Sequence, residues 1–193
     1  MTNILRKYND SRVYIINEAG VMSKIILAFL FAIAIAVTSQ IKIYLAFTPV
    51  PINLATFAVC ASALTLGGFW SFISVTIFIL AGTIGLPSTI APHAFGATTG
   101  YLTGYALCAL VLGKYTEKNN TNNMIKASIV LFISQIVIIH ICGMIGLYIW
   151  SLSIGSPYTF VEVIMKGSLP FLIGDSIKAI VLSSIMTAIL KNK

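Results

Sequence analysis

Long apolar runs, separated by short polar or Gly- and Pro-rich breaks, limit most strongly how this sequence can fold. A helix needs about 20 apolar residues to cross the hydrocarbon core of a bilayer. Hydrophobic residues make up 58% of the chain and charged residues only 9%, whereas soluble domains carry about 25% charged residues. We therefore expect an all-α integral membrane protein, a bundle of six transmembrane helices over residues 25–45, 52–66, 70–86, 98–112, 125–152 and 169–190.

Basic residues are concentrated in alternate connections between these runs. An even number of helices places both termini on one side, which then holds nine Lys and Arg residues, while the other side holds only Lys42 and Lys166. Lys and Arg accumulate in cytoplasmic loops, so we expect cytoplasmic termini, with residues 1–24 as a cytoplasmic tail and 25–193 as one transmembrane domain. The nine residues are Arg6, Lys7, Arg12, Lys24, Lys114, Lys118, Lys126, Lys191 and Lys193.

The net charge of +7 does not indicate a nucleic-acid-binding protein. Binding to phosphates requires a basic face on a folded surface, and here the basic residues are divided among connections between apolar runs. The partner that composition does predict is membrane lipid, with the chain crossing the cell (cytoplasmic) membrane several times.

The last apolar run contains a pair of opposite charges. Asp175 lies near its start and Lys178 follows three residues later, a spacing that puts both side chains on one helix face. Charges inside a membrane are costly, so they usually line a cavity or pair with each other. Two interpretations stay open. Either Lys178 holds a solute carboxylate while Asp175 accepts hydrogen bonds from N–H groups, or the two form a self-satisfied ion pair that locks the helix in place.

Ala28, Ala32 and Ala36 recur every four residues in the first run and form a stripe of small side chains. Small residues let helices approach closely in lipid. The spacing alone fits packing within the chain and docking to a separate membrane subunit equally well.

Catalytic and metal-binding motifs are missing from the sequence. The Gly-x-x-x-x-Gly-Lys-Ser/Thr phosphate loop is absent, so any energy from ATP must come from a partner. Gly174-Asp175-Ser176 resembles the start of a hydrolase block, whose serine needs a base placed beside it. Neither histidine, His93 or His140, has a carboxylate nearby in sequence, so we do not expect Ser176 to be a catalytic nucleophile. We expect no enzyme and no cofactor. We interpret His140 as a hydrogen-bonded packing residue, and His93, in an outward loop, as a candidate for contact with solute.

Four sequence blocks resemble the BioY family. Residues 41–52 contain Phe-Thr-Pro-Val-Pro-Ile, the core of the family's first-loop signature, and residues 82–87 resemble its Gly-x-x-Gly-Leu-Pro. Residues 98–105 resemble its Thr-Gly-Gly-Tyr block, and 170–178 resemble its Pro-Phe-x-x-Gly-Asp-x-x-Lys block. The blocks occur in the family order. The chain departs from the pattern at Asn53, Ala55 and Thr99, which bear on the ceiling of a pocket.

The resemblance implies a function. BioY proteins are the biotin-specific substrate-binding (S) components of energy-coupling-factor (ECF) transporters, so residues 25–193 would form a biotin-binding domain. The implied partners are a transmembrane coupling subunit and ATP-binding subunits. Alternatives are an S component for another vitamin, or a biotin transporter that acts alone. The implied substrate-binding residues are Asp175, Lys178, Thr98, Tyr101, Asn53 and His93, and the implied docking residues are Ala28, Ala32 and Ala36.

Overall fold

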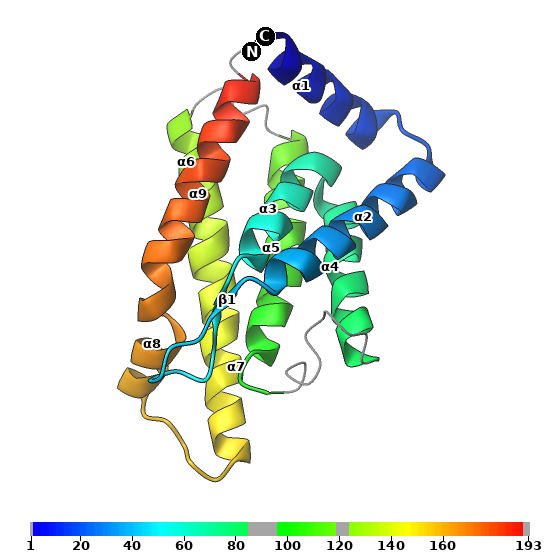
Figure 1. Ribbon diagram of the computed structural model, residues 1–193. Helices are drawn as coiled ribbons and strands as arrows, with labels where there is room; N and C mark the ends of the chain where they lie inside the picture. Colours follow the sequence, from blue (N-terminus) through cyan, green and yellow to red (C-terminus); the bar gives the residue numbers. More distant parts are fainter. Residues whose placement is uncertain (1, 85–95, 119–123, 191–193) are drawn as a thin grey trace.

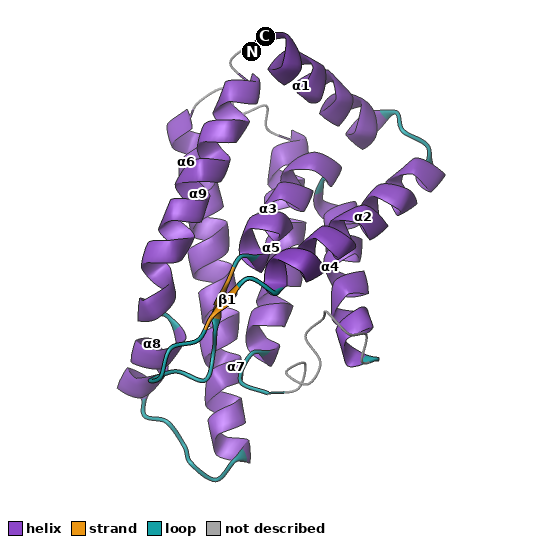
Figure 2. Ribbon diagram, in the orientation of Figure 1, coloured by secondary structure: helices purple, strands orange, loops and turns teal. Residues whose placement is uncertain are grey.

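The computed structural model describes residues 2–84, 96–118 and 124–190, and most of them are helical (Figures 1 and 2). Helices are the expected solution for apolar runs, because a helix satisfies its own backbone hydrogen bonds where water is absent. The elements are α1 (Thr2–Asn17), α2 (Val21–Ser39), β1 (Lys42–Ile43), β2 (Ile52–Asn53), α3 (Ala55–Leu66), α4 (Gly68–Thr83), α5 (Thr99–Lys118), α6 (Met124–Ile133), the π-helical turn η1 (Ser134–Ile139), α7 (His140–Ser153), α8 (Phe160–Gly167) and α9 (Leu169–Leu190).

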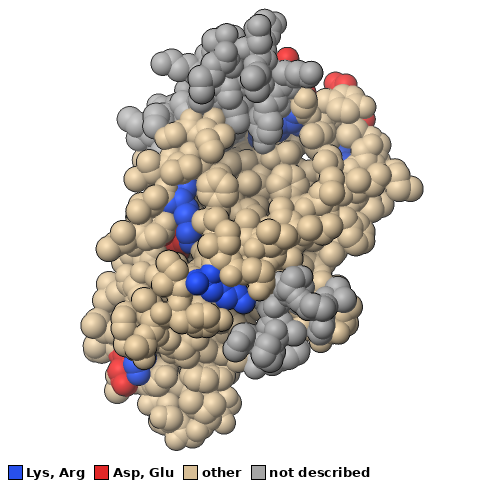
Figure 3. Space-filling model, in the orientation of Figure 1, with Lys and Arg blue, Asp and Glu red and all other residues tan. Residues whose placement is uncertain are grey.

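Three helical segments of the described chain are long and apolar enough to cross a membrane: Val21–Ser39, Ile129–Ser153 and Phe160–Ile185. Helices α3 and α4 are apolar but shorter. On the three long segments, large apolar side chains such as Phe29, Ile145 and Ile177 are exposed. The face seen in Figure 3 carries few charged side chains among those described. The predicted helical architecture is confirmed, with the addition of two strands of two residues each.

Helix α5 holds the bundle together, since it packs against α3, α4 and α7. Two glycines allow a close contact between α5 and α7. A Cβ atom added to Gly146 in α7 would lie 2.5 Å from the Cα atom of Gly100 in α5, so the two backbones touch. Elsewhere α2 packs across α3 and α4, and α6 packs along α9.

The first run ends earlier than expected. Helix α2 stops at Ser39 rather than near residue 45, because the chain turns into an antiparallel hairpin in which Lys42 pairs with Asn53. The hairpin encloses the Thr-Pro-Val-Pro segment, whose prolines cannot continue a helix. The sixth run, in contrast, forms α9 with the predicted bounds, Leu169–Leu190.

The expected N-terminal tail contains helix α1, which packs against α3 and α9. Arg12 links α1 to α3 and also to α5. Its guanidinium group is buried and donates to the backbone carbonyl of Leu64 and, at 2.9 Å, to that of Thr116. These carbonyls lie near the C-terminal ends of α3 and α5, where helix carbonyls lack partners within the helix.

The alanine stripe of α2 faces the chain's own core. Ala28 is fully buried, Ala32 is 4% exposed, and Ala36 is partly buried against the core. These small side chains allow α2 to lie close to α3 and α4. Packing within the chain therefore accounts for them in this structure, and docking through the stripe stays a prediction.

Candidate functional site

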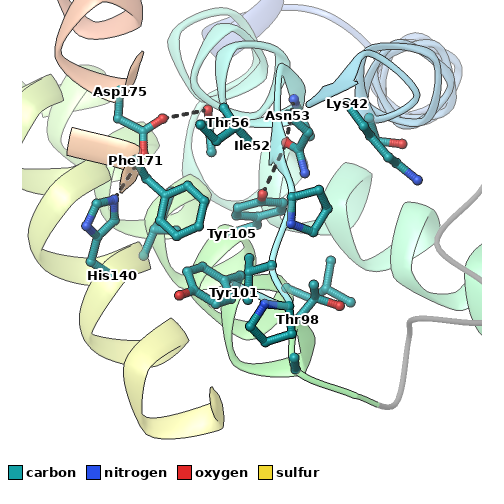
Figure 4. A pocket seen from close by; sticks show the side chains of 18 of the residues that line it. Lys42, Ile52, Asn53, Thr56, Thr98, Tyr101, Tyr105, His140, Phe171 and Asp175 are labelled. Atoms are coloured by element: carbon teal, nitrogen blue, oxygen red, sulfur yellow. Dashed lines mark hydrogen bonds and ion pairs between the residues drawn. The ribbon is translucent and has the colours of Figure 1, made fainter. Parts of the chain in front are cut away.

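A cavity lies between the β1–β2 hairpin and helices α3, α5, α7 and α9. In Figure 4, Asp175 and His140 lie on one side of it and Lys42 on the other, with Tyr101 and Tyr105 between them. Small-molecule sites usually combine an apolar wall with a few convergent polar groups, and this cavity has both. Its apolar wall includes Val50, Ile52, Phe78, Leu102, Ile139 and Phe171.

The carboxylate of Asp175 is the centre of the polar side, although the residue is only 5% exposed. Lys178 Nζ lies 2.8 Å from its Oδ1 atom, and His140 Nε2 lies 3.0 Å from its Oδ2 atom. Thr56 Oγ1 makes a longer contact of 3.4 Å with Oδ1. A carboxylate has about four acceptor positions, so Asp175 can still accept a hydrogen bond from a ligand.

Lys178 is held by its own chain. In addition to Asp175, its ammonium group donates to the backbone carbonyl of Asn53 at 2.7 Å and to Thr56 Oγ1 at 3.0 Å. An ammonium group has three hydrogens, and these three contacts use all of them. Lys178 therefore neutralises Asp175 and ties α9 to β2 and α3, and it has no hydrogen left for a ligand carboxylate in this arrangement.

His140 orients Asp175 from α7. An ionised carboxylate can only accept, so the hydrogen is assigned to Nε2, and Nδ1 then accepts from the Ser168 hydroxyl at 2.8 Å. The turn η1 directly precedes His140. A π-helical turn shifts the residues after it relative to an ideal helix, and such turns are frequent at functional sites. It thus helps to set the direction in which His140 faces.

Three aromatic side chains form the wall between the two polar ends. The rings of Tyr101 and Phe171 meet edge to face, with centroids 6.0 Å apart. Tyr101 donates to the backbone carbonyl of Gly167 at 2.5 Å, and its ring occupies the space that a side chain at Gly143 would need. Tyr105 reaches the side-chain oxygen of Asn53 at 3.4 Å. These contacts fix the rings before any ligand arrives.

The first loop closes one end of the cavity. Within it, Thr48 Oγ1 donates to the backbone carbonyl of Lys166 at 2.7 Å and accepts from Val50 N at 3.2 Å. This links the Thr-Pro-Val-Pro segment to the end of α8. Pro49, Val50 and Pro51 all line the cavity, so the segment that carries the most specific sequence block also forms part of the wall.

The structure brings together five of the six residues expected to bind substrate. Asn53, Thr98, Tyr101, Asp175 and Lys178 all line this cavity. His93 lies outside the described residues.

Sequence analysis did not assign Lys42, Thr56, Tyr105, His140 and Phe171 to the site, although all five line the cavity. His140 is hydrogen-bonded, as expected. One of its partners is Asp175, which makes it part of the cavity wall as well as a packing residue. The signal available for it was a histidine inside an apolar run, which is weak. Phe171 stands in the Pro-Phe-x-x-Gly-Asp block and could have been found there.

Comparison with known proteins gives consistent results. A family model described as the BioY family matches residues 9–193. The probable biotin transporter BioY of Methanothermobacter thermautotrophicus is 32% identical over 127 residues, which cover 61% of this chain and 79% of that protein. The biotin transporter BioY of Rhizobium etli is 29% identical over 178 residues, which cover 86% and 91%.

The fold also matches a solved structure. A crystal structure of the S-component for biotin from an ECF-type ABC transporter superposes with a TM-score of 0.74 and 23% sequence identity. The match covers 86% of this chain and 89% of the solved chain. At this identity the likeness concerns the fold.

Proposed function

This chain belongs to the BioY family, and from that premise we propose that it takes up biotin as the substrate-binding (S) component of an ECF-type transporter. The observation that carries the proposal is the buried carboxylate of Asp175 at one side of a largely aromatic and apolar cavity. Biotin has two ureido N–H donors, an apolar ring and chain, and a carboxylate. The carboxylate of Asp175 suits the ureido N–H groups, and the apolar wall of the cavity suits the ring and chain.

Asp175 provides the contact for the ureido group in this proposal. A hydrogen bond to a charged acceptor is worth about 1.5–3 kcal/mol, and it gains strength where water is excluded. His140, Lys178 and Thr56 hold the carboxylate in place, so little freedom is lost when the ligand binds. Tyr101, Thr98 and Asn53 would contact the ring and chain, and His93 is proposed as a further contact from the loop that follows α4.

The ligand can be tested directly. A thermal-shift panel on the purified protein in detergent should show stabilisation by biotin and none by equal concentrations of riboflavin or thiamine. A ligand that binds the native state raises the free energy of unfolding of the protein, and above its Kd this increase grows with the logarithm of the ligand concentration. The shift should therefore grow with added biotin. Stabilisation by another vitamin instead would support the alternative S component.

We also propose the partners and the mode of energy supply. The sequence lacks a phosphate loop, so a transmembrane coupling subunit and ATP-binding subunits would supply the energy. Labelled-biotin uptake should then require those subunits in the same cells. Uptake that continues in cells lacking every coupling subunit would favour a transporter that acts alone.

Docking through the small-residue face of α2 is the least direct part of the proposal, because Ala28 and Ala32 are buried in the chain itself. Ala36 is only partly buried, which makes it the useful position. If the face docks, Ala36→Phe should abolish uptake in cells containing the coupling subunits and leave biotin binding unchanged. Loss of both activities would mean that the alanine serves only the chain's own packing.

The proposed topology has six membrane crossings and both termini in the cytoplasm, with residues 1–24 as a cytoplasmic segment and the cavity facing outward. The distribution of Lys and Arg supports it. Asn17 and Ser156 are both exposed and suit a labelling test. A membrane-impermeant maleimide added to intact cells should label Ser156→Cys and not Asn17→Cys, with the parent chain as background. The reverse pattern would invert the topology.

A further inference from the structure

We propose that Lys42 binds the carboxylate of the ligand, a role that rests on the proposed function and that sequence analysis gave to Lys178. Lys178 is already committed, because its three hydrogens go to Asp175, Asn53 and Thr56. Lys42 also lines the cavity. Within the part of the chain that the structure describes, its ammonium group makes no hydrogen bond or ion pair.

The hairpin sets the side of the ladder on which the Lys42 side chain begins. Lys42 in β1 pairs directly with Asn53 in β2, and directly paired residues of an antiparallel ladder project to the same face, with Cβ atoms about 4.5–5.5 Å apart. Both residues line the cavity. Lys42 is therefore held beside the site by backbone pairing rather than by a contact of its own ammonium group.

Among the described residues, no carboxylate forms an ion pair with Lys42. The sequence contains five acidic residues. Asp175 is paired with Lys178, Glu162 lies 3.5 Å from Lys166, and Glu117 accepts from the Gly68 N–H at 2.8 Å.

The other two acids, Asp10 and Glu18, belong to the segment around α1, which lies far from β1 in Figure 1. A lysine at a cavity edge without an acid of its own suits an anionic group brought by the ligand. The predicted topology adds to this, since Lys42 and Lys166 are the two basic residues expected on the outward side and Lys166 already has Glu162.

The two ends of the cavity would then bind different groups of the ligand. Asp175 and His140 lie on one side and Lys42 on the opposite side, with Tyr101 and Tyr105 between them (Figure 4). An elongated ligand with N–H donors at one end and a carboxylate at the other fits this order of acceptor, apolar wall and cation. Lys42 would thus distinguish the free acid from derivatives whose carboxylate is blocked.

The test compares biotin with biotin methyl ester, which keeps the ring and loses the charge. Equilibrium binding to the purified protein is measured for the parent, for Lys42→Gln and for Lys166→Gln. The last variant is the control, because it removes the same charge from the other lysine expected on the outward side, which is paired with Glu162. We expect the parent and Lys166→Gln to prefer the acid by about 10- to 100-fold, the size of a hydrogen bond to a charged group. Lys42→Gln should bind acid and ester equally, with ester affinity unchanged, and Lys42→Arg should restore the preference.

Each other outcome has a separate meaning. A Lys42→Gln variant that still prefers the acid as strongly as the parent overturns the proposal, and Lys42 then faces lipid phosphate or water. A parent that binds acid and ester equally also overturns it, while the biotin assignment stands. A folded parent that binds neither compound refutes the proposed function itself.

Discussion

The ammonium group of Lys178 donates a 2.7 Å hydrogen bond to the backbone carbonyl of Asn53, a residue 125 positions earlier in the chain. This bond joins the last helix to the first-loop hairpin, and the same ammonium group holds Asp175 at 2.8 Å. One lysine therefore fixes both the acceptor of the proposed site and the strand that closes it. The bond also explains how a membrane helix tolerates two charges, since both are paired and nearly buried.

Removal of Lys178 alone should destabilise the protein strongly. Lys178→Ala leaves the carboxylate of Asp175 buried without its cation, and breaking a buried pair in this way costs about 3–5 kcal/mol. The double variant Asp175→Asn with Lys178→Gln carries no unpaired charge and should recover most of the lost thermal stability in detergent. It should still fail to bind biotin. If the double variant binds as the parent does, the pair is only a packing lock.

His140 should matter for affinity through the direction of its N–H group. His140→Leu removes the 3.0 Å contact with Asp175, so we expect biotin binding to weaken by about 10-fold, the size of one such hydrogen bond. His140→Gln offers an amide N–H in a similar place and should retain more affinity than the leucine variant. Ser168→Ala, which touches only the other ring nitrogen, serves as the control and should have the smaller effect. Equal affinity in both His140 variants would contradict the orienting role.

The contact between Gly146 and Gly100 should tolerate no side chain. In Gly146→Ala the added Cβ would lie 2.6 Å from the backbone nitrogen of Gly100, and overpacking of this kind costs about 1–3 kcal/mol. Gly174→Ala is the matched control, because its Cβ would meet only the Ile52 side chain at 4.0 Å. Thermal unfolding should show a lower midpoint for the first variant and no loss for the second. An unchanged midpoint in Gly146→Ala would contradict the close helix contact.

Arg12 should attach α1 to the bundle. Arg12→Gln leaves the carbonyls of Leu64 and Thr116 without their charged donor, which we expect to expose residues 2–17 to rapid hydrogen exchange or proteolysis. Arg12→Lys can reach one carbonyl and should show partial protection. Biotin binding should change little, because Arg12 does not line the cavity. Unaltered protection in Arg12→Gln would mean that other contacts hold α1.

The sequence predicted those parts of the fold that depend on local pattern. Apolar length identified α9 with its observed bounds, and the spacing of Asp175 and Lys178 on one helix face correctly anticipated their contact. It could not reveal that Lys178 also bonds Asn53 and Thr56, because those contacts depend on how distant segments pack. These contacts are the reason that we propose Lys42 for the ligand role first given to Lys178.

Two further features had no readable signal. The turn η1 lies in a run without Pro or Gly at that point, so nothing in the sequence marked a change of helix type before His140. Arg12 looked like one of several basic residues in a polar tail, and its burial becomes evident only when the ends of α3 and α5 are placed beside α1. Tertiary contacts, rather than local preference, decide both features.

The most direct test of the central claim is labelled-biotin binding to the purified protein, measured for the parent and for Asp175→Asn. Asparagine keeps the size of the side chain and removes the charged acceptor, so affinity should fall by about 10- to 100-fold while the variant remains folded by thermal unfolding. Tight binding by the parent together with this loss would support both ligand and site. Equal binding by a folded Asp175→Asn variant would contradict the account.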